Sequence, residues 1–454
     1  MFTERTSVGL DVHARSIVGC GLDTVTGETA RRRVVPTFEG VTDWLAELPA
    51  PVAVAYEAGP TGFGLARQLT AAGIRCVVAA PSKLQRPPGD RVKTDSRDAQ
   101  HLAKLLRMDQ IVEVRVPSVE QEAARDLVRA REDVRGDLMR SRHRLSKLLL
   151  RQGILYSGGH PWTGVHEQWL RGQHFALPGL QLAFDSAFET VLLTAARRDR
   201  LDHAITEMAV GSEYTPVVRR LCCLRGVSTL TGFGLAVEIG DWHRFTGSTI
   251  GAYLGLVPTE SSSGGQRSQG SITKTGNTHA RRLLVEAAWH HRKAYRPGLT
   301  MRARWDQAPA AARARGHEGN QRLHHRWEVF TARKKRPVIA DVAIARELAG
   351  WSLVAGRHAR LTPRVPGPPV WLAGAVVRRS APRTRYGAAP PPSRVAARSL
   401  RDRLRPPLTA ETSAAPARRK TRAGQGACPR GARRSASTHP PRARLGTPYQ
   451  ATRR

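Results

Sequence analysis

Carboxylates at three separate places in the chain have the types and settings of a divalent-metal site for phosphodiester chemistry. Asp11 lies in a short apolar run, Glu57 ends a second apolar run, and Asp95 and Asp98 are three residues apart. An ionised carboxylate among apolar residues is costly unless a cation or hydrogen bonds compensate it. Clustered carboxylate oxygens suit Mg²⁺, which keeps open positions for a substrate phosphate. Solvated acids at the ends of elements are the alternative explanation.

The elements around these acids must be strands and helices that bring them together. The segment from Ser7 to Asp23 is β-rich, and the pattern predicts further strands at residues 52–57 and 74–80, with helices at 38–48 and 62–72 between them. This alternation indicates a mixed α/β layer. A helix that begins near Thr94 or Asp95 would place Asp95 and Asp98 on one face of its first turn.

The sequence after Ser118 predicts two long helices. Steps of three and four residues separate the positions Ala124, Leu127, Arg131, Val134, Leu138, Ser141, Leu145 and Leu148, and six of these eight are apolar. A second helical stretch runs from about Leu180 to Met208. Such helices form either an antiparallel pair or a dimerisation arm.

A Ser/Gly-rich segment from Thr259 to Thr278 contains the second group of chemical interest. Three serines, Ser261, Ser262 and Ser263, precede a glycine pair, and a serine hydroxyl attacks phosphorus when a base or metal activates it. The segment holds no His or Asp, so a familiar triad is absent. A flexible polar loop is the alternative interpretation.

Residues near this segment have the chemistry of phosphate contacts. Arg267, Lys274 and Asn277 are residue types that bind nucleic-acid backbones. We expect the three histidines that follow to be surface or DNA-facing residues of a basic helix, because their spacing is not that of a metal site. These histidines are His279, His290 and His291.

Net charge points to a polyanionic partner. The chain carries +36 with a pI near 11.5, and Lys and Arg release condensed counterions when they neutralise phosphates. No apolar run of about 18 residues exists to span a bilayer, and residues 1–20 lack the apolar core of a signal peptide. The sequence therefore predicts a cytoplasmic, nucleic-acid-binding protein.

The last fifth of the chain differs in composition. Residues 361–454 hold 15 of the 30 prolines and 20 Arg and one Lys against two acids, which is +19 of the +36. This composition predicts disorder. It is typical of an unstructured nucleic-acid-binding arm, or of a stretch translated after a frame disruption.

Seven short motifs follow one another in a fixed order along residues 5–355. They are Gly-Leu-Asp11-Val, Tyr-Glu57-Ala-Gly-Pro-Thr-Gly62, Lys-Thr-Asp95-Ser-Arg-Asp98-Ala, Leu-x-Gly-Val-x-x-x-Thr231, Tyr253-Leu-Gly-Leu-Val-Pro258, Ser-Ser-Gly264 and Ile-Thr-Lys-x-Gly-Asn277. This order resembles the insertion-sequence transposases of the one-hundred-and-ten type. That family includes RNA-guided recombinases and site-specific DNA invertases.

The resemblance implies a fold and a division of labour. It implies a RuvC-like domain of RNase H-like fold in residues 1–115, a helical coiled-coil insertion in 116–212, and a mostly helical C-terminal transposase domain in 213–355, followed by the disordered tail 361–454. By the same likeness, four acids would ligate Mg²⁺ and Ser263 would form a transient phosphoserine link to DNA, with Ser261 and Ser262 as alternatives. These acids are Asp11, Glu57, Asp95 and Asp98.

The resemblance also implies partners. The DNA would be the ends of a mobile element and its target, the assembly would be a homodimer or homotetramer, and members with a guide RNA use it to select both DNAs. Two other functions remain open. One is a RuvC-type nuclease that hydrolyses branched DNA without a serine, and the other is a non-catalytic nucleic-acid-binding remnant of a mobile element.

Overall fold

A computed structural model describes residues 4–84 and 94–357 of the chain. The whole tail that was predicted to be disordered, 361–454, lies outside these residues. Within the described ranges, no helix has the length and apolar character needed to cross a membrane.

A five-stranded mixed sheet forms the N-terminal part, in the order β3-β2-β1-β4-β5. Strand β1 pairs with β2 antiparallel and with β4 parallel, while β2–β3 is antiparallel and β4–β5 is parallel. The strands are β1 (Thr6–Val12), β2 (Ile17–Asp23), β3 (Thr29–Val34), β4 (Val52–Glu57) and β5 (Arg75–Ala79). The predicted mixed α/β layer is confirmed.

Strand β3 was not predicted from the sequence. Its residues Thr-Ala-Arg-Arg-Arg-Val show no alternation of apolar and polar side chains, and only Val34 is buried. The strand lies at the sheet edge and forms because its backbone completes the hydrogen-bond ladder of β2. Local pattern cannot reveal such a strand, since its stability comes from a partner strand.

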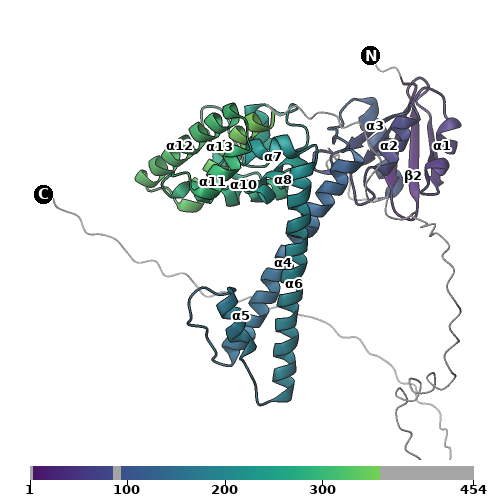
Figure 1. Ribbon diagram of the computed structural model, residues 1–454. Helices are drawn as coiled ribbons and strands as arrows, with labels where there is room; N and C mark the ends of the chain where they lie inside the picture. The colour runs from purple at the N-terminus through teal and green to yellow at the C-terminus, as the bar shows by residue number, and fades with distance from the viewer. Residues whose placement is uncertain (1–3, 85–93, 358–454) are drawn as a thin grey trace, which may run out of the picture. The chain divides into compact units, whose positions relative to one another are not determined.

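Helices cover the two faces of this sheet (Figure 1). One face packs apolar side chains such as Leu10 and Tyr56 against α1 (Phe38–Ala46) and α2 (Gly64–Ala71). Helix α3 (Asp95–Arg107) crosses the other face so closely that a Cβ on Gly9 would lie 2.0 Å from the carbonyl oxygen of Ala99. Glycine at position 9 therefore allows the start of α3 to lie against the ends of β1 and β4.

Two long antiparallel helices, α4 (Val119–Arg151) and α6 (Pro178–Gly211), lie side by side (Figure 1). Both were predicted, and Ser118 caps α4 by accepting a hydrogen bond from the amide of Gln121. The short helix α5 (Gly164–Arg171) was not predicted. It packs Leu170 against the same apolar cluster as Leu148 of α4 and Phe184 of α6.

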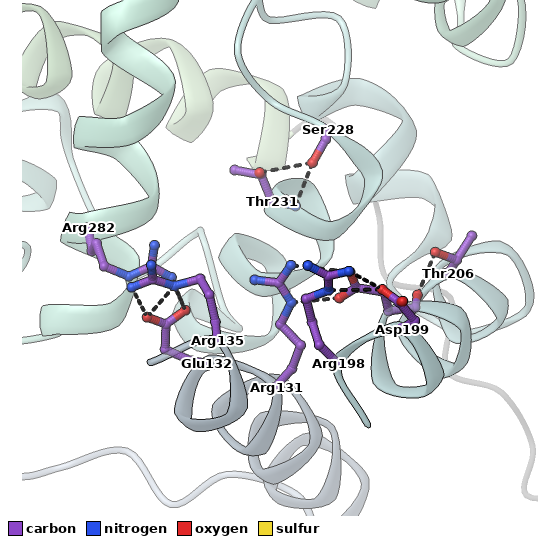
Figure 2. Close-up of polar contacts among 10 residues, drawn as sticks. Arg131, Glu132, Arg135, Arg198, Asp199, Thr206, Ser228, Thr231 and Arg282 are labelled. Atoms are coloured by element: carbon purple, nitrogen blue, oxygen red, sulfur yellow. Dashed lines mark hydrogen bonds and ion pairs between the residues drawn. The ribbon is translucent and has the colours of Figure 1, made fainter. Parts of the chain in front are cut away.

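Ion pairs join the N-terminal half of α4 to its neighbours. Arg131 Nε lies 2.6 Å from Asp202 Oδ1 of α6. Figure 2 shows Glu132 between Arg135, on the same helix, and Arg282 of a later helix. The arginines in this half of α4 thus hold helices together.

The C-terminal part is mostly helical and surrounds one large apolar core that includes Phe233, Leu254, Trp327 and Ile344. A two-stranded hairpin, β6 (Pro258–Glu260) and β7 (Gln269–Ile272), extends from it. Its helices are α7 (Thr215–Leu221), α8 (Thr229–Ile239), α9 (Gly247–Tyr253), α10 (Thr278–Ala288), η2 (Trp289–Arg292), α11 (Leu299–Asp306), α12 (Ala310–Ala332) and α13 (Pro337–Arg357).

Candidate active site

The ends of β1 and β4 place two of the predicted acids at the same edge of the sheet. The strands are parallel, with Leu10 opposite Tyr56, so Asp11 and Glu57 each follow directly after a paired residue. Side chains alternate along a strand, and both acids therefore belong to the face that α3 covers. Asp11 and Glu57 are each half-buried.

Helix α3 brings the other two acids to this edge. Thr94 caps the helix by accepting a hydrogen bond from the amide of Arg97, and Asp95 and Asp98 both lie in the first turn. Ligand atoms of Asp11, His13 and Asp95 lie within 4.8 Å of one another. Glu57 and Asp98 are outside that tight group, although Asp98 is close enough to act on the charge of Asp11.

Electrostatics at this edge suit a bound cation. Burial raises the pKa of Asp11 above its usual value, His13 opposes the shift, and the carboxylates of Asp95 and Asp98 raise it further. Like charges therefore accumulate around a partly desolvated carboxylate. A divalent cation would relieve this repulsion, so the donor set of carboxylate oxygens and one imidazole fits a metal ion.

His13 belongs to this group although the sequence pattern did not predict it. Its Nε2 lies 3.3 Å from Asp11 Oδ2 and 4.0 Å from Asp95 Oδ1. The available signal was its spacing, because a residue two positions after Asp11 points to the same side of an extended chain. The unpredicted strand β3 adds Arg33, whose guanidinium is 3.9 Å from Asp95 Oδ2.

The serine segment forms a hairpin, in which the polar residues 261–268 connect β6 to β7. Its exposed tip holds Ser263, which bridges to Gln266, and Gly264, whose φ of 58° favours glycine. Ser262 Oγ donates to Glu260 Oε1 at 3.0 Å. Among the described residues, we find no hydrogen-bond partner for the Ser263 hydroxyl. Glu260, which the sequence did not single out, is therefore the carboxylate nearest to these serines in the hairpin.

Hydrogen bonds join the residues that precede β6 to those that follow β7. The amide of Lys274 donates to Gly255 O at 3.1 Å, and that of Asn277 donates to Tyr253 O at 3.3 Å. Arg281 Nη1 donates to the carbonyl oxygens of Leu254 and Thr275, at 2.9 and 2.8 Å. The hairpin that carries the serines therefore leaves the helical core from a fixed base.

A buried carboxylate, Glu238 of α8, lies at this base and was also missed. Its side chain is 0% exposed and accepts hydrogen bonds from Arg129 Nε and Nη2, both at 2.9 Å. Asn277 Nδ2 donates to it at 2.7 Å, and His279 Nδ1 lies 3.0 Å from it. Glu238 thus joins α4, α8 and the end of the serine hairpin.

Glu238 occupies side chains that the sequence predicted for other roles. Asn277 is a residue type that contacts phosphate, but its amide hydrogen-bonds to Glu238 and caps α10. His279 was expected at the surface or facing DNA, and its side chain is largely buried against Glu238.

The same expectation is wrong for His291, which is fully buried, whereas His290 is exposed. Burial, followed by the charge of Arg225, lowers the pKa of His291 to about 3.

Replacement of Glu238 by glutamine is expected to destabilise the protein by about 2–4 kcal/mol at neutral pH, because it leaves buried donors poorly matched. Burial alone would raise the pKa of Glu238, but hydrogen bonds from His279, Arg129 and Asn277 hold it well below its usual range. The ionised Glu238 carboxylate therefore stabilises the folded state, and this contribution is complete above about pH 4.5, the usual pKa of a glutamate. The contribution is lost as the pH falls through the pKa of Glu238 in the folded state.

Denaturant unfolding of the wild type and of Glu238→Gln at several pH values measures this difference. Glu167→Gln is the matched control, since it breaks an exposed pair with Arg171 and should change stability by only about 0.5 kcal/mol. Equal stability of Glu238→Gln and the wild type at pH 7 would contradict the role assigned to Glu238.

Comparison with known proteins identifies the class of this chain. Residues 8–153 match a family model of the DEDD type from IS110 elements, described as a transposase. Residues 218–304 match a model described as Transposase IS116/IS110/IS902 family. Both the acidic site and the serine hairpin lie within matched residues. The chain is therefore a transposase, an enzyme of DNA recombination encoded by insertion sequences.

Similar proteins have the same assignment over much of the chain. The Sinorhizobium fredii protein y4qE, named as a transposase, is 39% identical over 308 residues, which are 68% of this chain and 76% of that protein. The transposase for insertion sequence element IS1533 of Leptospira borgpetersenii is 32% identical over 344 residues, 72% of this chain and 97% of that protein. The chain belongs to the IS116/IS110/IS902 transposase family.

Proposed function

We propose that this transposase cuts and rejoins DNA strands with Mg²⁺ held by carboxylates and with Ser263 as nucleophile. The observation that carries the proposal is the convergence of Asp11 and Asp95, from a strand end and a helix start, within 4.8 Å. Packing does not require acids at these positions. They are instead the oxygen ligands that Mg²⁺ prefers in phosphoryl-transfer sites.

In this proposal Asp11, Glu57, Asp95 and Asp98 hold the metal. A bound divalent ion would neutralise charge on a backbone phosphate. Ser263 Oγ bonds to phosphorus and loses its proton, while the bridging backbone oxygen leaves as a free hydroxyl. Attack by a hydroxyl of another strand then releases Ser263, so the energy of the phosphodiester bond is kept for rejoining.

We further infer that residues 1–115 have an RNase H-like, RuvC-like fold, with a coiled-coil insertion in 116–212 and a transposase domain in 213–355. Support comes from the mixed sheet in which the parallel strands β1 and β4 bring the acids to one edge. The antiparallel α4 and α6 support the second inference. The element's own ends and target are the proposed DNA partners, with a homodimer or homotetramer as the assembly and a structured guide RNA as the selector of target.

A hydrolytic RuvC-type nuclease is the second candidate. The observation in its favour is that Ser263 has no activating hydrogen-bond partner in the described part of the chain. Water would then be the nucleophile, and the acids alone would suffice.

Product analysis of the full chain on DNA that carries the element's ends tests these functions. Incubation with Mg²⁺ is expected to give a protein–DNA adduct that survives denaturation, together with rejoined strands. Hydrolysed ends without any adduct would overturn the serine mechanism in favour of the nuclease. Binding without Mg²⁺-dependent cleavage would overturn both and indicate a non-catalytic remnant.

A further inference from the structure

The C-terminal half of α4 carries a row of cations that the proposed chemistry does not use. Arg144, Lys147 and Arg151 are all exposed on one side of the helix, and we call them the cation row; His143 is exposed beside them. Residues 140–151 contain no Asp or Glu. The row therefore concentrates positive charge on a single helix face.

In the part of the chain that the structure describes, these cations have no carboxylate partners, unlike three arginines in the N-terminal half of the same helix. Arg129, Arg131 and Arg135, in the N-terminal half, all form ion pairs with acids. Within the described residues, no carboxylate pairs with any member of the cation row, and Arg144 donates only to Ser141 Oγ, at 3.1 Å. Their charge is consequently available to a ligand.

The cation row lines a groove of about 610 Å³ between α4 and α6. The α6 wall is built from small side chains, and Leu148 of α4 also lines the groove. The α6 residues are Ala183, Ser186, Ala187 and Thr190. The acids of this part of α6, Asp185 and Glu189, do not line it. The described side chains that line the groove therefore include positive charges and no carboxylate.

We propose that this groove binds the phosphate backbone of duplex DNA. Arg144 and Arg151 are seven residues apart, or about 10 Å along a helix, which spans more than one phosphate of a strand. The described residues that line the groove include no Phe, Tyr or Trp, the large rings on which unpaired bases stack in single-strand sites. Contacts between charge and phosphate carry no sequence information, so the groove positions DNA and does not select it.

This inference deepens the proposed function, because it assigns a place to duplex DNA outside the acidic site and the serine hairpin. It also rests on the DNA substrate of the transposase. Its test needs neither metal nor serine chemistry. Failure of the groove can therefore be distinguished from failure of the cleavage mechanism.

The test measures binding of the full chain to a labelled duplex of random sequence in the presence of chelator, between about 50 and 200 mM salt. The variant Arg144→Gln, Lys147→Gln, Arg151→Gln removes three charges from exposed positions. We expect the slope of its plot of log affinity against log salt concentration to be smaller in magnitude by about 2–3, because each phosphate contact contributes about 0.9 to that slope. Affinity at the lowest salt should fall at least about tenfold.

The matched control keeps the charges and exchanges the residues, as Arg144→Lys, Lys147→Arg, Arg151→Lys. It should retain the wild-type slope, because backbone attraction depends on charge. Thermal unfolding should be equal for all three proteins. An unchanged slope in the triple Gln variant would overturn the proposal.

Two further results would also overturn it. One is that the triple Gln variant binds an RNA hairpin of similar length more weakly than the wild type does but binds duplex DNA normally, which would make the groove an RNA site. The other is a change of oligomeric state in the triple Gln variant without nucleic acid, which would make this face an interface between copies of the chain.

Discussion

Replacement of Ser263 by alanine is expected to abolish the covalent protein–DNA adduct while DNA binding persists. The hydroxyl oxygen is the atom that would bond to phosphorus, and alanine has no substitute for it. Ser263 is exposed at the tip of a hairpin whose base is fastened by backbone hydrogen bonds. The variant should therefore fold normally, and loss of the adduct should exceed about 10³-fold.

Denaturing gel electrophoresis of labelled element-end DNA after reaction measures the adduct. Ser261→Ala and Ser262→Ala are matched controls in the same tip, and both should retain it. Ser262 donates to Glu260, so its variant tests whether that hydrogen bond orients the tip. A normal adduct yield from Ser263→Ala would refute the assignment, and loss in Ser262→Ala alone would move the nucleophile by one residue.

Substitution of Asp11 by asparagine is expected to reduce strand cleavage at least about 10²-fold. A metal ion stabilises charge in such a transition state by several kcal/mol, and each 1.4 kcal/mol is about tenfold in rate. Asp98→Asn should act in the same direction. Full cleavage by both variants would refute the metal site. Glu28→Gln, at an exposed turn between β2 and β3, is the control and should cleave normally.

Stability provides a second readout of the same site. Because the folded-state pKa of Asp11 is raised, its ionised form costs folding free energy at neutral pH in the absence of metal. Asp11→Asn should therefore unfold at the same or a higher temperature than the wild type in chelator. With Mg²⁺ at about 100 times its Kd, the wild type should gain about 2.7 kcal/mol and the variant much less. A wild-type gain retained by Asp11→Asn would contradict metal binding by Asp11.

Much of the acidic site was predictable because its signals are local. The apolar runs that end in Glu57 and surround Asp11 predict strands, and Thr94 before Asp95 predicts a helix start. Strand β3 and the hairpin strands β6 and β7 were not predicted. Most of their residues are exposed and polar, and these segments form strands because of the strands with which they pair.

The sequence by itself determined which carboxylates and serines are available and on which elements they lie, since strand and helix patterns depend on near neighbours. Only the tertiary structure decided that His13 joins Asp11 and Asp95, and that Glu238 is a buried junction. The hydrogen-bond partners of Glu238 are far from it in the sequence: Arg129 is separated from it by 109 positions, Asn277 by 39 and His279 by 41. No local pattern records such contacts, because burial and pairing of a charge arise only when distant elements pack together.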